Sequence, residues 1–293
     1  MLEQKRSNEA MNLSADKNLT GSSALQLWLA YPGDLAEPAI EKACAAILDD
    51  AERERAARFR FARHRREYLA THALARVALS HAHALAPQSW SFSINKYGKP
   101  SPVPGCGLGF NQSNSVELAV CLVARPGAAA AAEVGVDVES LARAEEIVPL
   151  AARVFSAAER AQLDGLPAAE RPDRALSLWT LKEAYIKARG MGLSLPLQEI
   201  SFLFDGSDAD GHDAIRFQVA PEVDDDPGRW RFCRFDHAGH RIAVAVEVNA
   251  ARIPEIALEI YEVRPPLGPP ARLTWGAPAW FPVTARKGSV RGA

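Results

Sequence analysis

The chain has 293 residues, of which 48% are hydrophobic and 24% are charged, as in ordinary soluble globular proteins. This apolar content can build a sizeable core, so the composition excludes a wholly disordered chain, and the length suits two modules or one large one. Lysine and arginine number 34 against 36 aspartates and glutamates. The resulting net charge of −2 argues against a dedicated nucleic-acid binder.

The cysteines and the N-terminal residues bear on the cellular compartment. Cys44, Cys106, Cys121 and Cys233 form no C-x-x-C pair, so we expect reduced thiols rather than a disulfide framework or a zinc site. Residues 1–23 are polar and do not resemble a signal peptide, and no apolar run approaches the roughly 20 residues of a membrane span. We therefore expect a cytoplasmic protein with no membrane contact.

The chain divides into four segments by composition. Residues 1–23 are expected to be a disordered arm, 24–130 an N-terminal half, 131–250 a C-terminal half, and 251–293 a tail. The tail is rich in proline from about Ile253 and is expected to wrap the surface or to stay disordered, so the folded part is expected to span about 24–250.

In the first half, alternation predicts a strand over 24–30. The helical pattern that follows over 40–85 must break, because a single helix of that length is unusual in a globular domain. Glycine and proline predict a turn at 96–100, an apolar run predicts a strand over 116–124, and the simple composition of 126–132 indicates a linker.

A similar order of elements recurs in the second half, where the predicted strands are 134–139, 215–219, 230–235 and 242–248 and the predicted helices are 148–154, 157–163 and 175–189. The last strand echoes the sequence at 117–123. This faint repeat predicts an α+β fold built from two similar halves.

Two carboxylates occur in Gly-Val-Asp-Val-Glu at 135–139. Because strand side chains alternate, Asp137 and Glu139 share one face and lie about 7 Å apart along the strand. From that face they can bind one hard cation together. The alternative is the acidic, solvated face of an edge strand.

A third carboxylate lies in the helical segment 179–187. Glu183 and Lys187 are at positions i and i+4 on one helix face, and Trp179 lies one turn before Glu183. The functional interpretation places Glu183 opposite the two strand carboxylates, with a lysine one turn further on. The alternative is a surface ion pair worth a few tenths of a kcal/mol.

Three further polar groups can bind phosphate. The turn at 96–100 offers lysine, and the polar run at 110–115 precedes a strand, although each is also an ordinary turn or loop. Seven arginines stand within 14 residues and are either a solvated helix face or a surface for phosphate or an acidic partner: Arg53, Arg55, Arg58, Arg60, Arg63, Arg65 and Arg66. Of these, Arg55, Arg58 and Arg66 are expected on one helical side.

Five short motifs in this order resemble the 4′-phosphopantetheinyl transferases of the Sfp type. They are K-Y-G-K-P at 96–100, F-N-x-S-x-S at 110–115, G-V-D-V-E at 135–139, F-S-x-x-E at 155–159 and W-x-x-K-E-A-x-x-K at 179–187. The order is more specific than any single motif, and it favours the functional interpretation of Asp137, Glu139, Glu183 and Lys187. A Gly-x-Gly-Leu-Ser run follows the last motif, as it often does in these enzymes.

The resemblance implies a pseudo-dimer of two similar α+β halves with the site between them. It implies transfer of the phosphopantetheine arm of coenzyme A to a serine of an acyl or peptidyl carrier protein. Mg²⁺ would be held by Asp137, Glu139 and Glu183 and would offset charge on the pyrophosphate. Glu183 would accept the serine proton, and Lys187 would stabilise the leaving oxygen.

The resemblance also implies a set of residues that bind coenzyme A: Arg55, Arg66, Lys99, Ser113, Asn114, Asp137 and Lys187. Arg55 and Arg66 would meet the 3′-phosphate, and Lys99 would lie by the adenine and its phosphates. The arginine-rich region offers a docking surface for an acidic carrier. Both halves lie in one chain, so a monomer is expected.

One position departs from the family pattern, which usually has F-N-x-S-H-S. Asn114 stands where the histidine contacts a coenzyme A phosphate, and asparagine can donate a hydrogen bond but carries no charge. We expect weaker coenzyme A binding, by about 1–2 kcal/mol for a lost charge-assisted bond. The departure also leaves an alternative open, a degenerate member that acts as a carrier-binding or regulatory protein. A nucleic-acid binder that uses the arginines lacks a reading motif.

Overall fold

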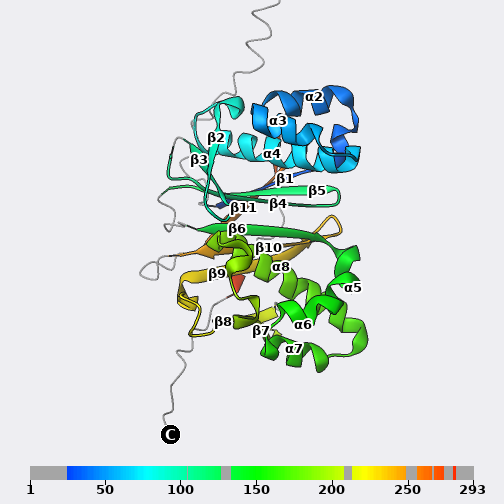
Figure 1. Ribbon diagram of the computed structural model, residues 1–293, viewed down its shortest axis with the longest axis vertical. Coiled ribbons are helices and arrows are strands. Elements are labelled where there is room, and N and C mark those ends of the chain that lie inside the picture. The colour runs from blue at the N-terminus through cyan, green and yellow to red at the C-terminus, as the bar shows by residue number, and fades with distance from the viewer. Residues whose placement is uncertain are drawn as a thin grey trace, which may run out of the picture.

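The computed structural model describes residues 25–103, 105–126, 133–207, 213–248, 256–265, 267–273 and 280–281. They form four layers, with helices above one β-sheet, a second β-sheet beneath it, and further helices below (Figure 1). The expected arm, nearly all of the linker and much of the tail lie outside the described residues. Within the described part of the chain, no helix is long and apolar enough to cross a bilayer.

The upper sheet has five strands in the order β12-β11-β1-β5-β4. Their bounds are β1 Leu25–Ala30, β4 Gly109–Ser115, β5 Leu118–Ala124, β11 Leu258–Val263 and β12 Pro270–Arg272. Three helices cover the outer face of this sheet, α2 Pro38–Ala46, α3 Asp50–Ala57 and α4 Ala62–Ala82 (Figure 1). The expected break in the long helical pattern is therefore confirmed, and it occurs twice. A small hairpin of β2 Ser91–Ile94 and β3 Pro100–Val103 lies beside them.

The lower sheet has four strands in the order β13-β9-β10-β6. Their bounds are β6 Val134–Ser140, β9 Trp230–His237, β10 His240–Glu247 and β13 Trp280–Phe281. The helices below are α5 Ala144–Ile147, α6 Ala151–Val154, α7 Ala157–Asp164 and α8 Arg171–Arg189, and a second hairpin comprises β7 Ile200–Ser207 and β8 Asp213–Val219. The 3-10 turns are Pro32–Ala36, Pro87–Ser89, Leu141–Arg143, Val148–Leu150, Ala168–Glu170, Gly192–Ser194, Leu197–Glu199 and Pro227–Arg229.

Strand alternation explains why the two sheets stack. On β5, Leu118, Val120 and Leu122 face the other sheet, and on β10 the same is true of Ile242 and Val244. The intervening residues of each strand face the helices. Both faces of these strands are therefore buried, which explains why neither strand has the polar face of a solvated sheet. The similarity between these two segments reflects equivalent positions, since each is an inner strand of its sheet.

The polar run at 110–115 is a strand and not the strand-leading loop that we expected. It forms most of β4, at the edge of the upper sheet, and its alternate side chains reach across to β6 at the edge of the lower one. Asn111 Oδ1 accepts a hydrogen bond from the backbone nitrogen of Val136 at 3.0 Å, and Ser115 Oγ accepts one from that of Ser140 at 3.0 Å. These side chains satisfy edge backbone groups that would otherwise be buried without partners.

The predicted end of the folded part, near residue 250, is wrong. Strand β11 lies inside the upper sheet, parallel to β1 and between β1 and β12. Leu258 and Ile260 enter the core between the sheets, while the ring of Tyr261 stacks on Trp28 at a centroid distance of 4.7 Å. The alternating Leu-Glu-Ile-Tyr-Glu-Val sequence of β11 is a strand pattern that the surrounding prolines obscured.

Helix α8 lies unusually close to β6 because residue 135 is glycine. A Cβ atom built on Gly135 would overlap the carbonyl oxygen of Ala184 and lie 2.5 Å from the backbone nitrogen of Ala188. Real Cβ atoms essentially never approach other atoms that closely, so only glycine permits this contact. The small side chain of Ala188 serves the same contact from the helix side.

We expect Gly135→Ala to destabilise the protein by at least about 2 kcal/mol, because the helix must move away from the strand. Gly33→Ala is the matched control, since nothing lies within 4 Å of a Cβ atom there, and it should change stability by less than about 0.5 kcal/mol. Urea unfolding of both variants measures the difference. Equal midpoints for the two variants would contradict the close contact.

Candidate active site

Asp137 and Glu139 face α8 from β6, as the alternation of the strand predicted. Val136 and Val138 point the opposite way, into the core between the sheets. Asp137 is 4% exposed and Glu139 is 9% exposed. The solvated-edge alternative is therefore wrong, because these carboxylates are buried beneath a helix.

Helix α8 brings Glu183 and Lys187 to the same place. The helix ends at Gly190, whose φ of +59° is the left-handed cap conformation that favours glycine. Lys187 Nζ lies 2.6 Å from Asp137 Oδ1 and donates to Ser113 Oγ at 2.6 Å. Ser113 in turn donates to Asp137 Oδ1 at 3.0 Å. A lysine of α8, a serine of β4 and an aspartate of β6 thus form one cluster across both halves.

Glu139 has two partners that the sequence analysis did not identify. The indole Nε1 of Trp179 donates to Glu139 Oε1 at 3.0 Å, and Arg143 Nη1 donates to Glu139 Oε2 at 2.5 Å. Burial and the charge of Asp137 raise the pKa of Glu139, while Arg143 and Trp179 oppose that rise. The position of Trp179 one turn before Glu183 was noted from the sequence, but its hydrogen bond depends on tertiary packing.

The carboxyl group of Glu183 has a pKa well above its usual range. Its pKa is raised to about 7, first by burial and then by the negative charges of Asp137 and Glu139, while the charge of Lys187 opposes the rise. The carboxyl group therefore changes its charge near neutral pH, which suits a general base. The effect of both aspartate and glutamate on Glu183 also means that the three predicted carboxylates share one electrostatic environment.

Some features of this cluster suit a divalent cation and others do not. Asp137 Oδ2 is buried without a hydrogen-bond partner, and a bound cation would give it one and relieve the repulsion among the carboxylates. Yet no group of three or more acidic, histidine or cysteine side chains in the described ranges is arranged to hold a metal. Lys187 and Arg143 instead neutralise Asp137 and Glu139.

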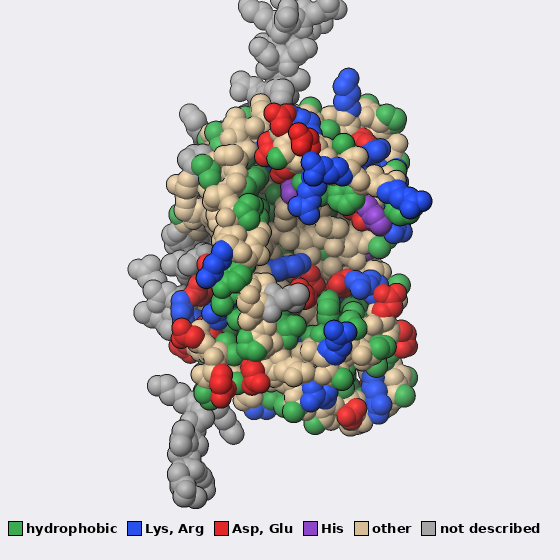
Figure 2. All heavy atoms as spheres, in the orientation of Figure 1, with side chains coloured by type: hydrophobic (Ala, Val, Ile, Leu, Met, Phe, Trp, Pro, Cys, Tyr) green, Lys and Arg blue, Asp and Glu red, His purple; other side chains and the backbone are tan. Residues whose placement is uncertain are grey.

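A pocket of about 260 Å³ adjoins this cluster. It lies between α4 of the upper half and α8 of the lower half and is lined by Tyr68, Thr71, His72, Gln112, Ser113, Asn114 and Lys187. Figure 2 shows a hollow where the halves meet, with basic and acidic side chains together at its floor. Gln112 Oε1 is buried there with no hydrogen-bond partner, so it can accept a hydrogen bond from a ligand in the pocket.

The pocket gathers some of the residues expected to bind coenzyme A. Ser113, Asn114 and Lys187 line it, and Asp137 contacts two of them. Arg55 approaches its edge, because its guanidinium lies 5.6 Å from the ring centre of Tyr68. Arg66 is half-buried on α4 and is not among the lining residues.

Lys99 is not among the residues that line the pocket, and its expected place by the adenine stays a prediction. Its Nζ donates to the carbonyl oxygen of Ala188 at 2.5 Å and pairs with Glu133. In the same turn, Asn95 Nδ2 donates to the carbonyl oxygen of Gly190 at 2.9 Å. The K-Y-G-K-P motif therefore caps the C-terminal end of α8 in this structure, where a cation is stabilised by the helix dipole.

The arginine cluster lies on two helices, so the expected single helical side is wrong. Arg55 belongs to α3, Arg66 belongs to α4, and the turn between these helices carries Arg58. Figure 2 shows basic side chains gathered on this upper part of the molecule. Arg58 pairs with Glu54 at 3.4 Å and Arg65 with Glu41 at 2.9 Å, and both arginines remain more than a third exposed.

The F-S-x-x-E motif is structural. Ser156 and Glu159 form a capping box at the start of α7, and Glu159 also accepts from the backbone nitrogen of Phe202 at 2.8 Å. Lys182, beside Glu183 in the sequence, pairs with Glu159 at 2.8 Å, and both are at most 1% exposed. Burial raises the pKa of Glu159 and lowers that of Lys182, and their mutual attraction opposes both shifts.

Comparison with known proteins identifies the family. A sequence model described as the 4′-phosphopantetheinyl transferase superfamily matches residues 133–245, which include both acidic motifs. The 4′-phosphopantetheinyl transferase HetI of Nostoc sp. is 33% identical over 182 residues, covering 61% of this chain and 73% of the relative. A 4′-phosphopantetheinyl transferase of Bacillus subtilis is 32% identical over 171 residues, covering 58% and 71% respectively.

The chain belongs to the 4′-phosphopantetheinyl transferases. The enzyme class implied by the five motifs is thereby confirmed, and the mixed α+β fold is that of the structure. A holo-(acyl-carrier-protein) synthase from Bacillus anthracis, solved in a complex with coenzyme A, covers 40% of this transferase and 96% of its own chain, at 19% identity and a TM-score of 0.32. That likeness is too remote to bear on the site.

Replacing Lys182 with methionine should destabilise this transferase by about 3–5 kcal/mol, because Glu159 would keep a buried charge without its partner. The matched control is Arg58→Met, which removes an exposed ion pair and should cost less than about 1 kcal/mol. Chemical unfolding at neutral pH measures both values. A loss for Lys182→Met no larger than that of the control would show that the buried pair contributes little.

Replacing Glu183 with glutamine should make the protein more stable at alkaline pH. The folded-state pKa of Glu183 is raised from 4.5 to about 7, so the wild type loses stability as pH rises through that interval. The stability advantage of Glu183→Gln should therefore appear above pH 4.5, grow up to about pH 7 and then level off. Thermal unfolding in a chelating buffer across this range measures it, and an advantage that is independent of pH would contradict the raised pKa.

Proposed function

We propose that this transferase moves the 4′-phosphopantetheine arm of coenzyme A to a serine of an acyl or peptidyl carrier protein, with Glu183 and Lys187 as its catalytic residues. Membership of the family supports the reaction. The observation that supports the residue roles is the meeting of a carboxylate with a pKa near 7 and a lysine within one cluster beside a pocket.

The proposed reaction joins the carrier serine oxygen to the phosphorus that bears the pantetheine arm. The bond between that phosphorus and the bridging oxygen of the pyrophosphate breaks, and adenosine 3′,5′-bisphosphate leaves. Glu183, once ionised, accepts the serine proton directly or through a water. Lys187 binds the pyrophosphate and offsets the charge that develops on the leaving oxygen.

A divalent cation, which we propose to be Mg²⁺, would be held by Asp137, Glu139 and Glu183. When bound, it would supply positive charge to the pyrophosphate oxygens. The unpartnered Oδ2 of Asp137 and the raised pKa values of both glutamates support a cation in this cluster. For the carboxylates to bind it, Lys187 would exchange Asp137 for the pyrophosphate, and Arg143 would release Glu139.

The finer features of the fold are also part of this proposal. We propose that the two halves are related as a pseudo-dimer, because each stacks a long helix, α4 or α8, on a sheet whose inner strand shares one alternating pattern. A monomer follows, since both halves of the pocket come from one chain. The four cysteines are all free thiols, which supports a cytoplasmic location.

One observation supports a second function. Asn114, which lines the pocket and is exposed, carries no charge. A degenerate member would bind carrier proteins or regulate them without transferring the arm. The ionisable cluster of Asp137, Glu183 and Lys187 supports the catalytic proposal over this one.

Intact-mass spectrometry of an apo carrier protein incubated with this protein, coenzyme A and Mg²⁺ tests the proposal. We expect a gain of one phosphopantetheine that is lost with EDTA and with Glu183→Gln. Glu170→Gln, an exposed carboxylate at the start of α8, is the control and should transfer normally. No gain across several carriers with coenzyme A binding intact would favour the carrier-binding alternative.

A further inference from the structure

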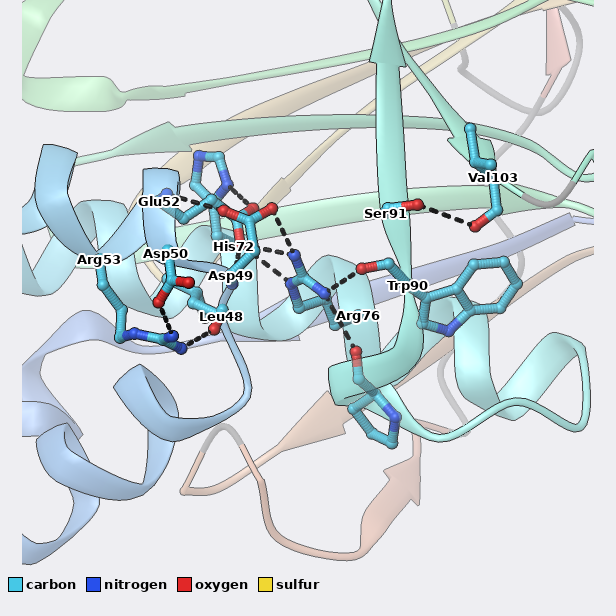
Figure 3. Close-up of polar contacts among 11 residues, drawn as sticks. Leu48, Asp49, Asp50, Glu52, Arg53, His72, Arg76, Trp90, Ser91 and Val103 are labelled. Atoms are coloured by element: carbon cyan, nitrogen blue, oxygen red, sulfur yellow. Dashed lines mark hydrogen bonds and ion pairs between the residues drawn. The ribbon is translucent and has the colours of Figure 1, made fainter.

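His72 lines the pocket from α4, opposite the catalytic lysine of α8. Its side chain is 25% exposed, and its Nδ1 lies 2.8 Å from Oε1 of Glu52 on α3 (Figure 3). Asn114 and Lys187 line the same pocket. The histidine that the family usually carries at position 114 is absent, but a different histidine from the other side thus reaches the same space.

The surroundings of His72 carry more negative than positive charge. Arg76 is fully buried and pairs with Glu52 at 2.6 Å and with Asp49 at 3.3 Å, so one guanidinium faces two carboxylates (Figure 3). The single guanidinium therefore offsets only one of the two carboxylate charges beside His72. Burial by itself raises the pKa of Glu52, but the hydrogen bond and charge of His72, with the charge of Arg76, hold that pKa below its usual value.

The hydrogen bond to Glu52 also determines which ring nitrogen is available. With Nδ1–H donated to the carboxylate, the second N–H of a charged imidazole, at Nε2, has no protein partner among the described residues. A carboxylate that orients a histidine in this way fixes its ring and stabilises its positive charge. Gln112 Oε1, unpartnered in the same pocket, is a second and independent indication of a polar ligand there.

We propose that His72, oriented by Glu52, supplies the positive charge that binds a phosphate oxygen of coenzyme A in this pocket. It takes the role that Asn114 cannot fill. This inference rests on the proposed function, because it assumes that coenzyme A is the ligand. It makes His72 a substrate-binding residue and Glu52 a positioning residue.

Coenzyme A binding to the full chain without carrier, measured by calorimetry, tests the proposal. His72→Gln retains an N–H group for Glu52 but carries no charge, and its Kd should rise about tenfold. The control is His64→Gln on the same helix, since His64 contacts Phe61 and Arg63 rather than the pocket, and its Kd should not change. A wild-type Kd for His72→Gln would overturn the proposal.

Moving the charge distinguishes binding from a structural role. In the His72→Gln background, Asn114→His should restore most of the affinity, because it returns a histidine to the same pocket from the exposed end of β4. His72→Arg, which keeps the charge, should bind more tightly than His72→Gln. Failure of both substitutions to recover affinity would show that the loss came from the disturbed Glu52 and Arg76 network, and would overturn the proposal.

Two further comparisons locate the phosphate and separate this proposal from the proposed function. Dephospho-coenzyme A should bind His72→Gln and wild type equally if the contact is to the 3′-phosphate, and should show the same tenfold loss if it is to the pyrophosphate; either supports the proposal. A wild type that binds no coenzyme A would defeat the proposed function itself. Normal wild-type binding with an unaffected His72→Gln would defeat only the role of His72.

Discussion

The contact of α8 with β6 across Gly135 is the constraint on which the site depends. A helix that packs on a sheet is normally separated from it by the side chains of both elements. Here Gly135 and Ala188 let the backbones of β6 and α8 come into direct contact. Side chains of moderate length on the two elements can therefore reach one another. Asp137 reaches Lys187, and Glu139 reaches Trp179, only because the two elements are this close.

The other family motifs support this contact from outside. The buried Glu159–Lys182 pair holds α8 from the side away from β6, and the turn that contains Asn95 and Lys99 closes its C-terminal end. Several motif residues therefore contribute to the candidate site only by holding α8 in position. Lys182 and Glu183 illustrate the division, since Lys182 is buried in an ion pair while its neighbour Glu183 belongs to the cluster of the candidate site.

Local periodicity was enough to predict which side chains meet at the centre of the candidate site. The alternation of Gly-Val-Asp-Val-Glu and the i, i+4 spacing of Glu183 and Lys187 put the right side chains on the right faces, and the motif order placed those faces opposite each other. Periodicity could not place three other residues, because turns and tertiary packing bring them to their partners. Lys99 binds a residue 89 positions away, Arg143 one 4 positions away across a strand end, and His72 one 20 positions away. Strand β11 was missed for another reason, since proline content outweighed a clear alternation.

The position of β11 also governs the order in which the molecule can assemble. The upper sheet begins with residue 25, yet the neighbour that pairs along the whole of β1 arrives more than 230 residues later. As the chain leaves the ribosome, the edge of β1 that pairs with β11 stays open until both halves have been made, and an open edge invites pairing with other chains. The N-terminal half is thus complete only when the C-terminal half already exists, and the core between the two sheets also joins the halves.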